Sequence, residues 1–266
     1  MPRVVKASGT LEKFDEEKLR RSLTGAGASA ELAEKIVEHV SSRVYDGIST
    51  DELHGITLEA LWRLRPRVAA SYNLRRALMM LGPSGYPFEK YYASLLRAYG
   101  YRVETDVLLD GRCARHEVDV VAEKGERRLM VECKYHSRPG TKVDLQVALY
   151  VYARFLDLRE YFTEAWLVTN TKFSEEAIRY ARCVGLSLRG WKYPEKEGLE
   201  RMIESKRLYP VTVIPSLDGE ARVRLLKANI VLLRELIALK PEDVSAITGL
   251  PIERAARILD EARRIA

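Results

Sequence analysis

The spacing of apolar residues changes twice along this chain. In residues 1–83, two short runs of alternating apolar and polar residues come first. Apolar residues then recur at helical spacing in 33–44, 50–64 and 68–81. Residues 84–194 mix helical stretches with continuous apolar runs, which are typical of buried strands. Helical spacing returns in 199–206 and after Gly219. The pattern predicts a multidomain α/β protein with a central sheet between two mainly helical parts.

The best candidate for a linker is the sequence Gly82-Pro83-Ser84-Gly85, because glycine and proline interrupt the helical pattern before them. It divides residues 1–83 from 84–194, and residues 195–266 form the helical remainder. The segment VTVIPSL (211–217) is interpreted as a strand or an extended connector to the central sheet. Two or three helices are expected after Gly219.

The twenty residues EVDVVAEKGERRLMVECKYH (117–136) contain the clearest candidate chemistry. The turn-forming sequence EKGE joins two apolar runs, which predicts a hairpin that brings Asp119 beside Glu132. Because side chains alternate along a strand, Glu132 and Lys134 lie on one face of it. The alternative interpretation is that they form the solvated face of an ordinary amphipathic strand.

Two carboxylates and an ammonium group suit metal-dependent hydrolysis of a phosphodiester. Mg²⁺ prefers hard oxygen ligands and keeps several waters, so one or two carboxylates suffice to bind it. Such an ion polarises a phosphoryl oxygen and lowers the pKa of a bound water. A lysine beside it steadies the charge that develops in the transition state.

These residues, with the strands and helices around them, resemble the PD-(D/E)xK nuclease superfamily, and in particular the Mrr-like type IV restriction endonucleases and archaeal Holliday-junction resolvases. The resemblance covers about residues 84–194 and implies a restriction-endonuclease-like α/β/α domain with a mixed sheet. It implies catalytic roles for Asp119, Glu132 and Lys134, with Asp119 and Glu132 as ligands of Mg²⁺ or Mn²⁺. One departure is Val118, which stands where many members have proline.

The same resemblance implies two supporting residues on helices. Glu89, in the sequence PFEKYYASLLRAYGY, lies on the same face as Tyr92 and Leu96, and the family has a glutamate here that assists metal or water binding. Gln146 is the only glutamine in the chain, and the family often places a glutamine on this helix, facing the catalytic centre.

Residues 1–83 carry a second resemblance. The sequence VVKASGTLEKFDEEKL predicts two short strands around Gly9 and a helix that starts near Asp15, and Ser49 or Thr50 can cap a later helix. This pattern resembles the ATP-cone, the nucleotide-binding domain of many ribonucleotide reductases. The matching residues are Val4, Lys6, Gly9, Glu12, Phe14, Asp15, Lys18, Thr50 and His54.

The ATP-cone resemblance implies ATP or dATP as a regulatory ligand. It implies that Lys6 and Lys18 meet phosphates, that Glu12 and its neighbours meet the nucleoside, and that Thr50 and His54 complete the pocket. Ala7 stands where the cone often has an arginine, so weaker binding or an altered nucleotide preference is expected. The alternative is a helical domain in which these polar side chains are merely solvated.

The C-terminal sequence ELIALKPEDVSAITGLPIERAARILDEA resembles a helix–hairpin–helix element. Its tight turn at Thr248, Gly249 and Leu250 is expected to offer backbone N–H groups to DNA phosphates. A full element usually has two glycines around the apolar residue, whereas this one has only Gly249. A helical packing or dimerisation module is the alternative.

The composition of the chain says more about where the protein is expected to work than about what it does. The net charge of +6 is spread along the chain, which favours a polyanionic partner only weakly. No signal peptide or membrane span is expected, and the three separated cysteines show no zinc spacing, so a cytoplasmic protein is expected. Few amides beside abundant Glu, Lys and Arg suggest a thermophile. The sequence lacks GxxxxGK[ST], so the cone is expected to sense a nucleotide rather than hydrolyse it.

Two functions are therefore compatible with the sequence. The first is a Mg²⁺-dependent DNA endonuclease regulated by ATP or a related nucleotide, in restriction or DNA repair, acting as a homo-oligomer. The second is a non-catalytic, nucleotide-responsive DNA-binding or regulatory protein on a nuclease-like fold. The presence of Asp119, Glu132 and Lys134 together favours the first.

Overall fold

The protein divides into two compact units. The computed structural model describes residues 2–6 and 8–266, so Ala7 lies outside the described residues. One unit comprises Met1–Leu74 with Arg263–Ala266, and the other comprises Arg75–Ala262. The division falls inside a helix rather than at Gly82-Pro83-Ser84-Gly85. The division into three domains stays a prediction.

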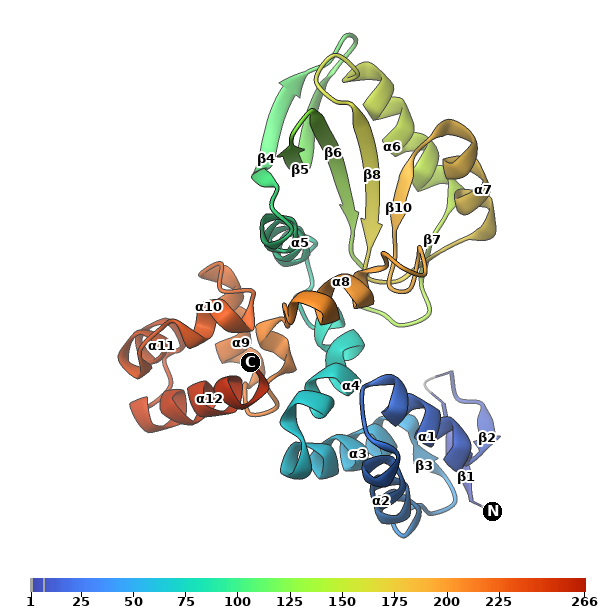
Figure 1. The fold of residues 1–266 in the computed structure, drawn as a ribbon, viewed down its shortest axis with the longest axis vertical. Helices are drawn as coiled ribbons and strands as arrows, with labels where there is room; N and C mark the ends of the chain where they lie inside the picture. The colour runs from blue at the N-terminus through green and yellow to red at the C-terminus, as the bar shows by residue number, and fades with distance from the viewer. Residues whose placement is uncertain (1, 7) are drawn as a thin grey trace. The chain divides into compact units, whose positions relative to one another are not determined.

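The first unit has a three-stranded sheet in the order β2-β1-β3, beside helices (Figure 1). Strands β1 (Arg3–Val5) and β2 (Leu11–Lys13) form the expected antiparallel hairpin. The sequence did not predict β3 (Ile48–Ser49), which pairs parallel to β1. The helices of this part are α1 (Glu16–Gly25), α2 (Ala30–Ser41), α3 (Thr50–Leu64) and α4 (Pro66–Met79), the last of which continues into the second unit.

Side-chain caps fix where two of these helices begin. Asp15 caps α1 by accepting a hydrogen bond from the backbone N–H of Lys18, and Ser49 caps α3 in the same way from Glu52. Because Ser49 is also the end of β3, the first turn of α3 lies directly beside β1. The core beneath is apolar and includes Leu23, Ile36, Val40 and Leu61.

The second unit is built on a five-stranded mixed sheet in the order β10-β8-β6-β5-β4. Strands β4, β5 and β6 are antiparallel neighbours, whereas β6, β8 and β10 run parallel. The strands are β4 (Arg102–Asp110), β5 (Arg115–Lys124), β6 (Arg127–Lys134), β8 (Glu164–Thr169) and β10 (Ser187–Arg189). A separate short pair consists of β7 (Lys142–Val143) and β9 (Lys172–Phe173).

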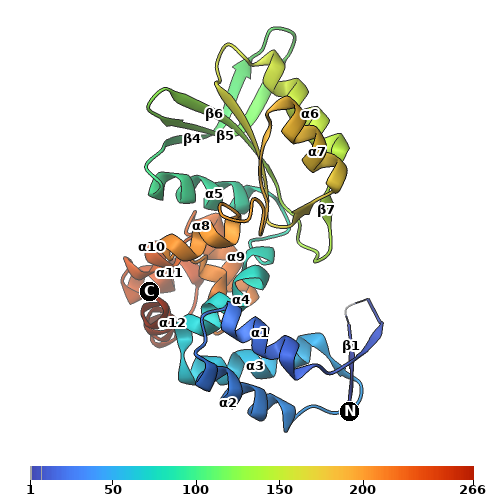
Figure 2. The ribbon, with the colours of Figure 1, turned by 45° about the vertical axis from the view of Figure 1, so that its right-hand side comes forward.

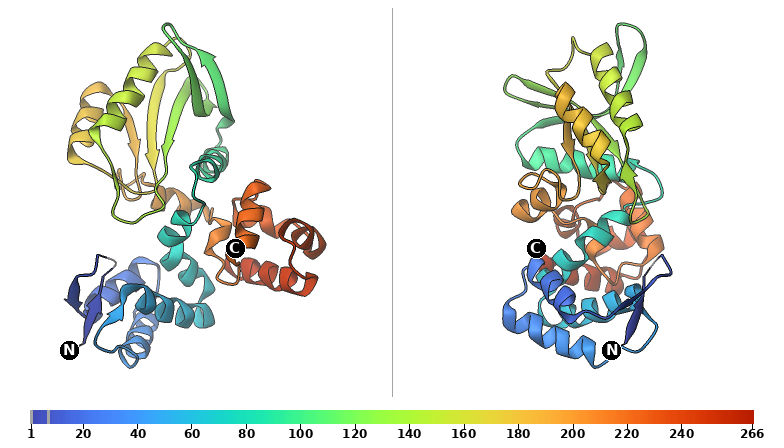
Figure 3. Two further views of the ribbon diagram at one scale, coloured as in Figure 1. Left: turned by 180° about the vertical axis from the view of Figure 1, so that it is seen from behind. Right: turned by 90° about the vertical axis from the view of Figure 1, so that its right-hand side faces the viewer.

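Helices cover both faces of this sheet, as the family resemblance implies. Helices α6 (Leu145–Asp157) and α7 (Glu175–Val184) lie side by side on one face (Figure 2). Helix α5 (Tyr86–Ala98) lies on the other face (Figure 3). Because side chains alternate between the two faces of a strand, Met130 and Leu167 point into the core under α6 and α7. Ser174 caps α7 and Gly185, at φ 81°, ends it, as predicted.

The C-terminal part of the second unit is helical, and hydrogen bonds tie it to α4 and α5. The Tyr91 hydroxyl donates to the carbonyl of Leu208 at 2.7 Å, and the Thr212 hydroxyl donates to the carbonyl of Ala77 at 2.7 Å. The helices are α8 (Leu199–Lys206), η1 (Val211–Val213), α9 (Gly219–Lys227), α10 (Leu233–Ile237), α11 (Pro241–Thr248) and α12 (Ile252–Ile265). The predicted fold class is therefore confirmed.

Two details of the prediction for this part were wrong. The segment 211–217, predicted as a strand or an extended connector, begins as the 3₁₀ turn η1 (Val211–Val213). Pro210 and Pro215 flank η1, and proline cannot donate to a sheet ladder. Four helices follow Asp218 instead of two or three. The chain is divided here because Asn229, at φ 59°, follows the end of α9, Pro241 is the first residue of α11, and Pro251 directly precedes α12. Among the helices of residues 2–6 and 8–266, none is long and apolar enough to cross a lipid bilayer.

Candidate active site

The hairpin of β5 and β6 brings Asp119 beside Glu132. The two strands pair from Lys124 opposite Arg127 to Val120 opposite Val131, with Gly125 in the turn at φ 60°. One residue further on, the backbone N–H of Cys133 donates to Asp119 Oδ2 at 2.7 Å. The carboxylate of Asp119 thus takes a position that a carbonyl would occupy in a regular ladder. The hairpin predicted from the sequence EKGE is confirmed.

Glu132 is almost completely buried, with 4% of its surface exposed. Lys134, two residues along the same strand face, places Nζ 3.1 Å from Glu132 Oε1. Arg154 Nη1 donates to Glu132 Oε2. A buried carboxylate is tolerated only where hydrogen-bonded cations offset the loss of its water. Both oxygens of Glu132 therefore have the partners that its burial requires.

Arg154 is a site residue that the sequence interpretation missed. It comes from α6, where it lies three residues after Val151 and four before Leu158, both buried in the core. It also donates to the carbonyl of Glu117 at 3.1 Å and to the hydroxyl of Tyr150. The sequence could have indicated this residue, because an arginine on the apolar face of a helix needs a buried partner of opposite charge.

Glu89 lies near the same carboxylates, from α5. Its side chain is half-buried, and its pKa is raised to about 7, first by burial and then by the charges of Asp119, Asp106 and Glu132. The pKa of Asp119 is raised to about 6, first by burial and then by Glu132, although the hydrogen bond from Cys133 opposes this. Burial and the neighbouring acids thus both favour the protonated forms of Glu89 and Asp119.

Asp106 is a further acid that the sequence interpretation did not single out. The pairs Thr105–Val120 and Val107–Val118 set it opposite Asp119 in the β4–β5 ladder. Its φ is 58°, a left-handed backbone that costs energy for a residue other than glycine. Lys90, next to Glu89 on α5, holds it with Nζ 2.5 Å from its Oδ2. A strained acid facing Asp119 points to a role at this site.

The donor set fits a divalent cation of the Mg²⁺ type. The ligands available are hard carboxylate oxygens, and burial followed by neighbouring negative charge raises the pKa of Asp119 and of Glu89. Throughout the described ranges, no cluster of three His, Cys, Asp or Glu side chains closes around one point. An ion of this type needs only one or two carboxylates and completes its shell with water. Asp119 and Glu132 would hold it.

Gln146 is less clearly part of the site. It is exposed in the first turn of α6, on the same i, i+4 row as Tyr150 and Arg154. No hydrogen bond within the described residues joins it to the carboxylates. Its catalytic role, like those of the other predicted residues, stays a prediction.

In the first unit, strand pairing gathers the candidate nucleotide-binding residues. Val4 on β1 pairs with Glu12 on β2 and with Ile48 on β3, so Glu12 and the start of α3 lie on either side of β1. Glu12 Oε2 lies 2.7 Å from Lys6 Nζ and 3.3 Å from Lys18 Nζ. The Lys6 contact is the main cause that lowers the pKa of Glu12, followed by the Lys18 contact. One carboxylate thus holds together the two lysines expected to meet phosphates.

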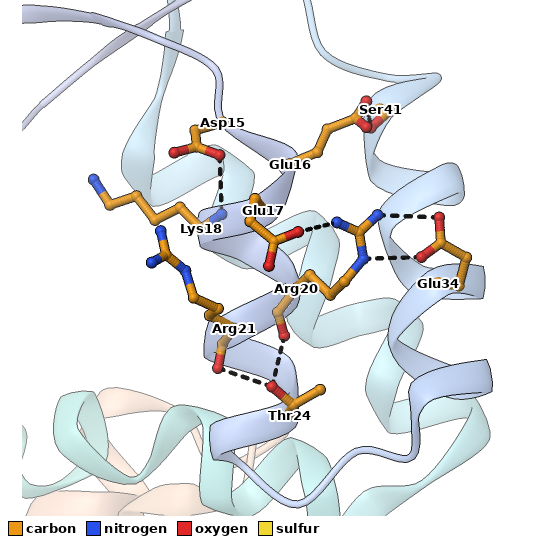
Figure 4. Close-up of polar contacts among 9 residues, drawn as sticks. All are labelled: Asp15, Glu16, Glu17, Lys18, Arg20, Arg21, Thr24, Glu34 and Ser41. Atoms are coloured by element: carbon orange, nitrogen blue, oxygen red, sulfur yellow. Dashed lines mark hydrogen bonds and ion pairs between the residues drawn. The ribbon is translucent and has the colours of Figure 1, made fainter.

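Polar contacts fix helix α1, which carries Lys18 (Figure 4). Arg20 bridges Glu17 and Glu34 and so ties α1 to α2. Lys18 and Arg21 extend on the same side of α1, away from that bridge (Figure 4). Arg21 is therefore a further cation on the Lys18 side of α1, which the sequence interpretation did not include.

The other expected cone residues have defined partners. Asp15 is the cap of α1, and Thr50 is the first residue of α3. His54 Nε2 lies 3.1 Å from Asn73 Oδ1, and its ring stacks on Tyr72 at 4.8 Å between centroids. These contacts fix the orientation of the imidazole in the first unit. Nucleotide contacts by these residues stay a prediction.

The C-terminal turn has its N–H groups already engaged. The N–H of Gly249, at φ 73°, donates to the carbonyl of Ser245 at 2.8 Å, and that of Leu250 donates to the Thr248 hydroxyl at 3.3 Å. Arg224 Nη1 donates to the carbonyl of Thr248 at 3.0 Å. A DNA contact here would thus need other groups or a rearranged turn. DNA binding by this turn stays a prediction.

Comparisons with known proteins agree with the two family resemblances. A family model described as "ATP cone domain" matches residues 2–79, and one described as "Restriction endonuclease" (Mrr_cat) matches residues 81–189. A third, described as "AF1548-like, C-terminal", matches residues 209–266. The predicted fusion of an ATP-cone with an Mrr-like nuclease domain is therefore confirmed.

Two relatives match most of their own length. An uncharacterized protein of Archaeoglobus fulgidus is 44% identical over 174 residues, which make up 65% of this chain and 98% of that protein. A solved structure, described as that of a protein of unknown function, AF1548, is 43% identical with a TM-score of 0.61. That match covers 68% of this chain and 98% of the other.

The buried ion pair gives a first prediction. Arg154→Ala leaves Glu132 with Lys134 as its one remaining cation among the described residues, so the free energy of unfolding should fall by about 3 kcal/mol. The measurement is urea denaturation at pH 7. The matched control is Arg159→Ala on the exposed surface, which should change stability by less than about 0.5 kcal/mol. Equal stability of Arg154→Ala and the unchanged protein would contradict the described role of the pair.

The raised pKa values give a second prediction. Cation binding needs ionised carboxylates, so Mn²⁺ affinity should be lost as the pH falls through 7 and 6, the values for Glu89 and Asp119. Without metal, the same shifts should lower stability as the pH rises through about 7, because the folded state holds the Glu89 proton more tightly. Calorimetric titration of Mn²⁺ between pH 5.5 and 8 checks the first expectation.

Glu89→Gln is the diagnostic variant for this pH dependence, and Glu104→Gln, an exposed change on β4, is its control. Glu89→Gln should remove the part of the dependence near pH 7, while Glu104→Gln keeps it. An Mn²⁺ affinity that stays constant across the whole range would show that these acids do not bind the cation.

Proposed function

Since this chain belongs to the AF1548-like family and joins an ATP-cone to a restriction-endonuclease domain, we propose that it is a metal-dependent DNA endonuclease regulated by a nucleotide. The observation that carries the proposal is the convergence of Asp119, Glu132 and Lys134 at the end of one hairpin, with Glu89 nearby. A cation at Asp119 and Glu132 would supply Lewis-acid polarisation of the scissile phosphate.

The protein's own residues have separable roles in the proposed hydrolysis. Lys134 presents an ammonium group at the edge of the carboxylate cluster, where it can stabilise charge on the phosphate oxygens. Glu89, with a pKa of about 7, suits proton acceptance from the attacking water at neutral pH. Water adds to phosphorus, the bond to one ester oxygen breaks, and that oxygen leaves with a proton. The products are one phosphate end and one hydroxyl end.

Lys90 and Arg154 act through other residues in this proposal. Lys90 holds the strained Asp106 opposite Asp119, and Arg154 orients the buried Glu132. Each therefore positions a carboxylate by an ion pair from a helix. DNA is the proposed substrate because its phosphodiester bond matches this chemistry and because restriction-endonuclease domains match the central region.

The Arg154 contact also favours a second candidate function. Both oxygens of Glu132 are engaged by cations, so a metal must share or displace one of them. If it cannot, the domain is a nucleotide-responsive DNA-binding or regulatory module without hydrolytic activity. The Mn²⁺ titration distinguishes the two functions, because only the enzyme needs the metal.

For the cone, we propose that ATP or dATP binds at Lys6 and Lys18 and alters the nuclease activity. The two lysines converge on Glu12, so a triphosphate would compete with this carboxylate for them. Released Glu12 would then be available for a hydroxyl of the nucleoside. The coupling between nucleotide and DNA binding is expected to be about 1–3 kcal/mol and reciprocal.

Catalysis gives a third prediction. Asp119→Asn and Glu132→Gln should each lower the rate of Mg²⁺-dependent DNA cleavage by more than about 100-fold, since metal ligands matter at least as much as their supporting contacts. DNA affinity, measured by gel shift without Mg²⁺, should stay unchanged. The matched control is Asp110→Asn, whose side chain is 83% exposed at the end of β4. Normal cleavage by either ligand variant would exclude the proposed centre.

Nucleotide binding gives a fourth prediction. Lys18→Ala should raise the Kd for ATP about tenfold or more, since one charge-assisted hydrogen bond is worth at least about 1.4 kcal/mol. Lys13→Ala, an exposed lysine on the neighbouring strand, is the matched control and should bind normally. Calorimetric titration measures both.

Cleavage and DNA affinity with and without ATP then test the regulatory part of this prediction. In the Lys13→Ala control, ATP should change the cleavage rate or the DNA affinity about fivefold or more, and in Lys18→Ala it should change them less. If ATP binds but changes neither the cleavage rate nor the DNA affinity, the proposed regulation is wrong, whereas the proposed nuclease activity is not affected by that result.

A further inference from the structure

A cavity of about 530 Å³ lies in the second unit, away from the carboxylate cluster. It is formed by the end of α5, the starts of β6 and β8, the end of β10, and α8. Its volume is within the usual range for small-molecule sites. Arg127 on its rim precedes Glu132 by five residues on β6, which is roughly 16 Å along a strand. The cavity is therefore separate from the proposed catalytic centre.

The cavity also opens on the other face of the sheet. Trp166 in its wall pairs with Val131, and its neighbours Ala165 and Leu167 point into the core under α6 and α7. Because side chains alternate, Trp166 points to the opposite side, where α5 and α8 lie. No residue of the carboxylate cluster lines this cavity.

Aromatic rings held in place form much of the wall. Trp166 is only 5% exposed, and its Nε1 donates to Glu164 Oε2 at 3.2 Å. Tyr101 packs edge-on against it, with ring centroids 6.4 Å apart. The Tyr99 hydroxyl is fixed by Ser205 Oγ at 2.7 Å. Rigid aromatic groups of this kind suit the stacking of a flat ring.

The charge of the cavity is positive. Four of its lining residues are cationic and one is acidic: Arg127, Arg189, Lys196 and Arg201 against Glu197. Arg189 stacks on Trp166, with Cζ 4.4 Å from the ring centroid. Its ion pair with Glu197 is to a side chain that is 64% exposed and so can move aside. Arg127 is held by both carboxylate oxygens of Glu164. An anion would thus meet preorganised guanidinium groups.

A buried polar group lies near these walls. The hydroxyl of Tyr92 is buried and has no hydrogen-bond partner within the described ranges. Tyr92 lies one helical turn before Leu96 on α5, and Leu96 lines the cavity. A buried hydroxyl left without a partner costs free energy, which a ligand or water can offset.

We propose that this cavity binds a nucleotide unit, with the base against Tyr99 and Tyr101 and the phosphate at Arg127, Lys196 and Arg201. A purely apolar ligand would leave the cations unused, and a simple inorganic anion would leave the aromatic wall unused. The nucleotide is either a free mononucleotide or an unpaired nucleotide of a DNA that the protein binds. The site is distinct from the cone and from the phosphodiester at Asp119.

The test uses the full chain with Lys6→Ala and Lys18→Ala, so that the cone does not contribute, and contains no divalent metal. AMP is titrated by calorimetry. In a second arm, fluorescence anisotropy compares a duplex carrying one unpaired base with the fully paired duplex. Arg201→Glu and Lys196→Glu are the cavity variants, both at exposed residues that should not disturb folding. Arg159→Glu, exposed and outside the cavity lining, is the charge-matched control.

AMP binding that both cavity variants weaken at least tenfold, and the control leaves intact, identifies a free nucleotide as the ligand. A preference for the unpaired duplex that both variants abolish, without AMP binding, identifies a nucleotide of DNA. The proposal is overturned if neither AMP affinity nor the preference for the unpaired base depends on Arg201 and Lys196. Because both arms read binding without metal, failure of the nuclease proposal would not affect either result.

Discussion

The carboxylate of Glu132, buried in the middle strand of the central sheet, is the constraint on which the rest of the site depends. An ionised acid at this depth is unstable without close cations, and Lys134 and Arg154 supply them from β6 and α6. The pair with Arg154 fixes the register of α6 over the sheet. The pair with Lys134 fixes the ammonium group at the edge where Asp119 arrives. The contacts of Glu132 therefore both position α6 on the sheet and arrange the candidate catalytic residues.

Around this point the fold concentrates negative charge. Asp119, Glu89 and Asp106 come from β5, α5 and β4. Burial first, and the charges of neighbouring acids second, raise the pKa of Asp119 and of Glu89. The protein also accepts a left-handed backbone at Asp106, which Lys90 holds in place. An arrangement that costs stability in the isolated chain is reasonable if a bound cation offsets the cost. The gathering of these acids at one point is therefore the strongest physical argument for a metal site.

The parts of this site that are close in sequence could be predicted. A turn signal and two apolar runs were enough to place Asp119 beside Glu132, since a hairpin leaves little choice of register. Glu89 came from family resemblance. Arg154 and Asp106 were missed because their partners are 22 and 13 residues away and on other elements, where spacing carries no information. β3 was missed for the same reason, because it pairs with β1, which lies more than 40 residues earlier in the sequence.

Direct observation of the ion tests the central claim best. Crystals of the protein grown with Mn²⁺ at pH 8, where Glu89 and Asp119 are ionised, would be examined by anomalous scattering. The account predicts one peak about 2.1 Å from an oxygen of Asp119 and an oxygen of Glu132, with Arg154 moved from the oxygen it holds without metal. A peak elsewhere, or none at saturating Mn²⁺ with the Glu132–Arg154 pair intact, would contradict it.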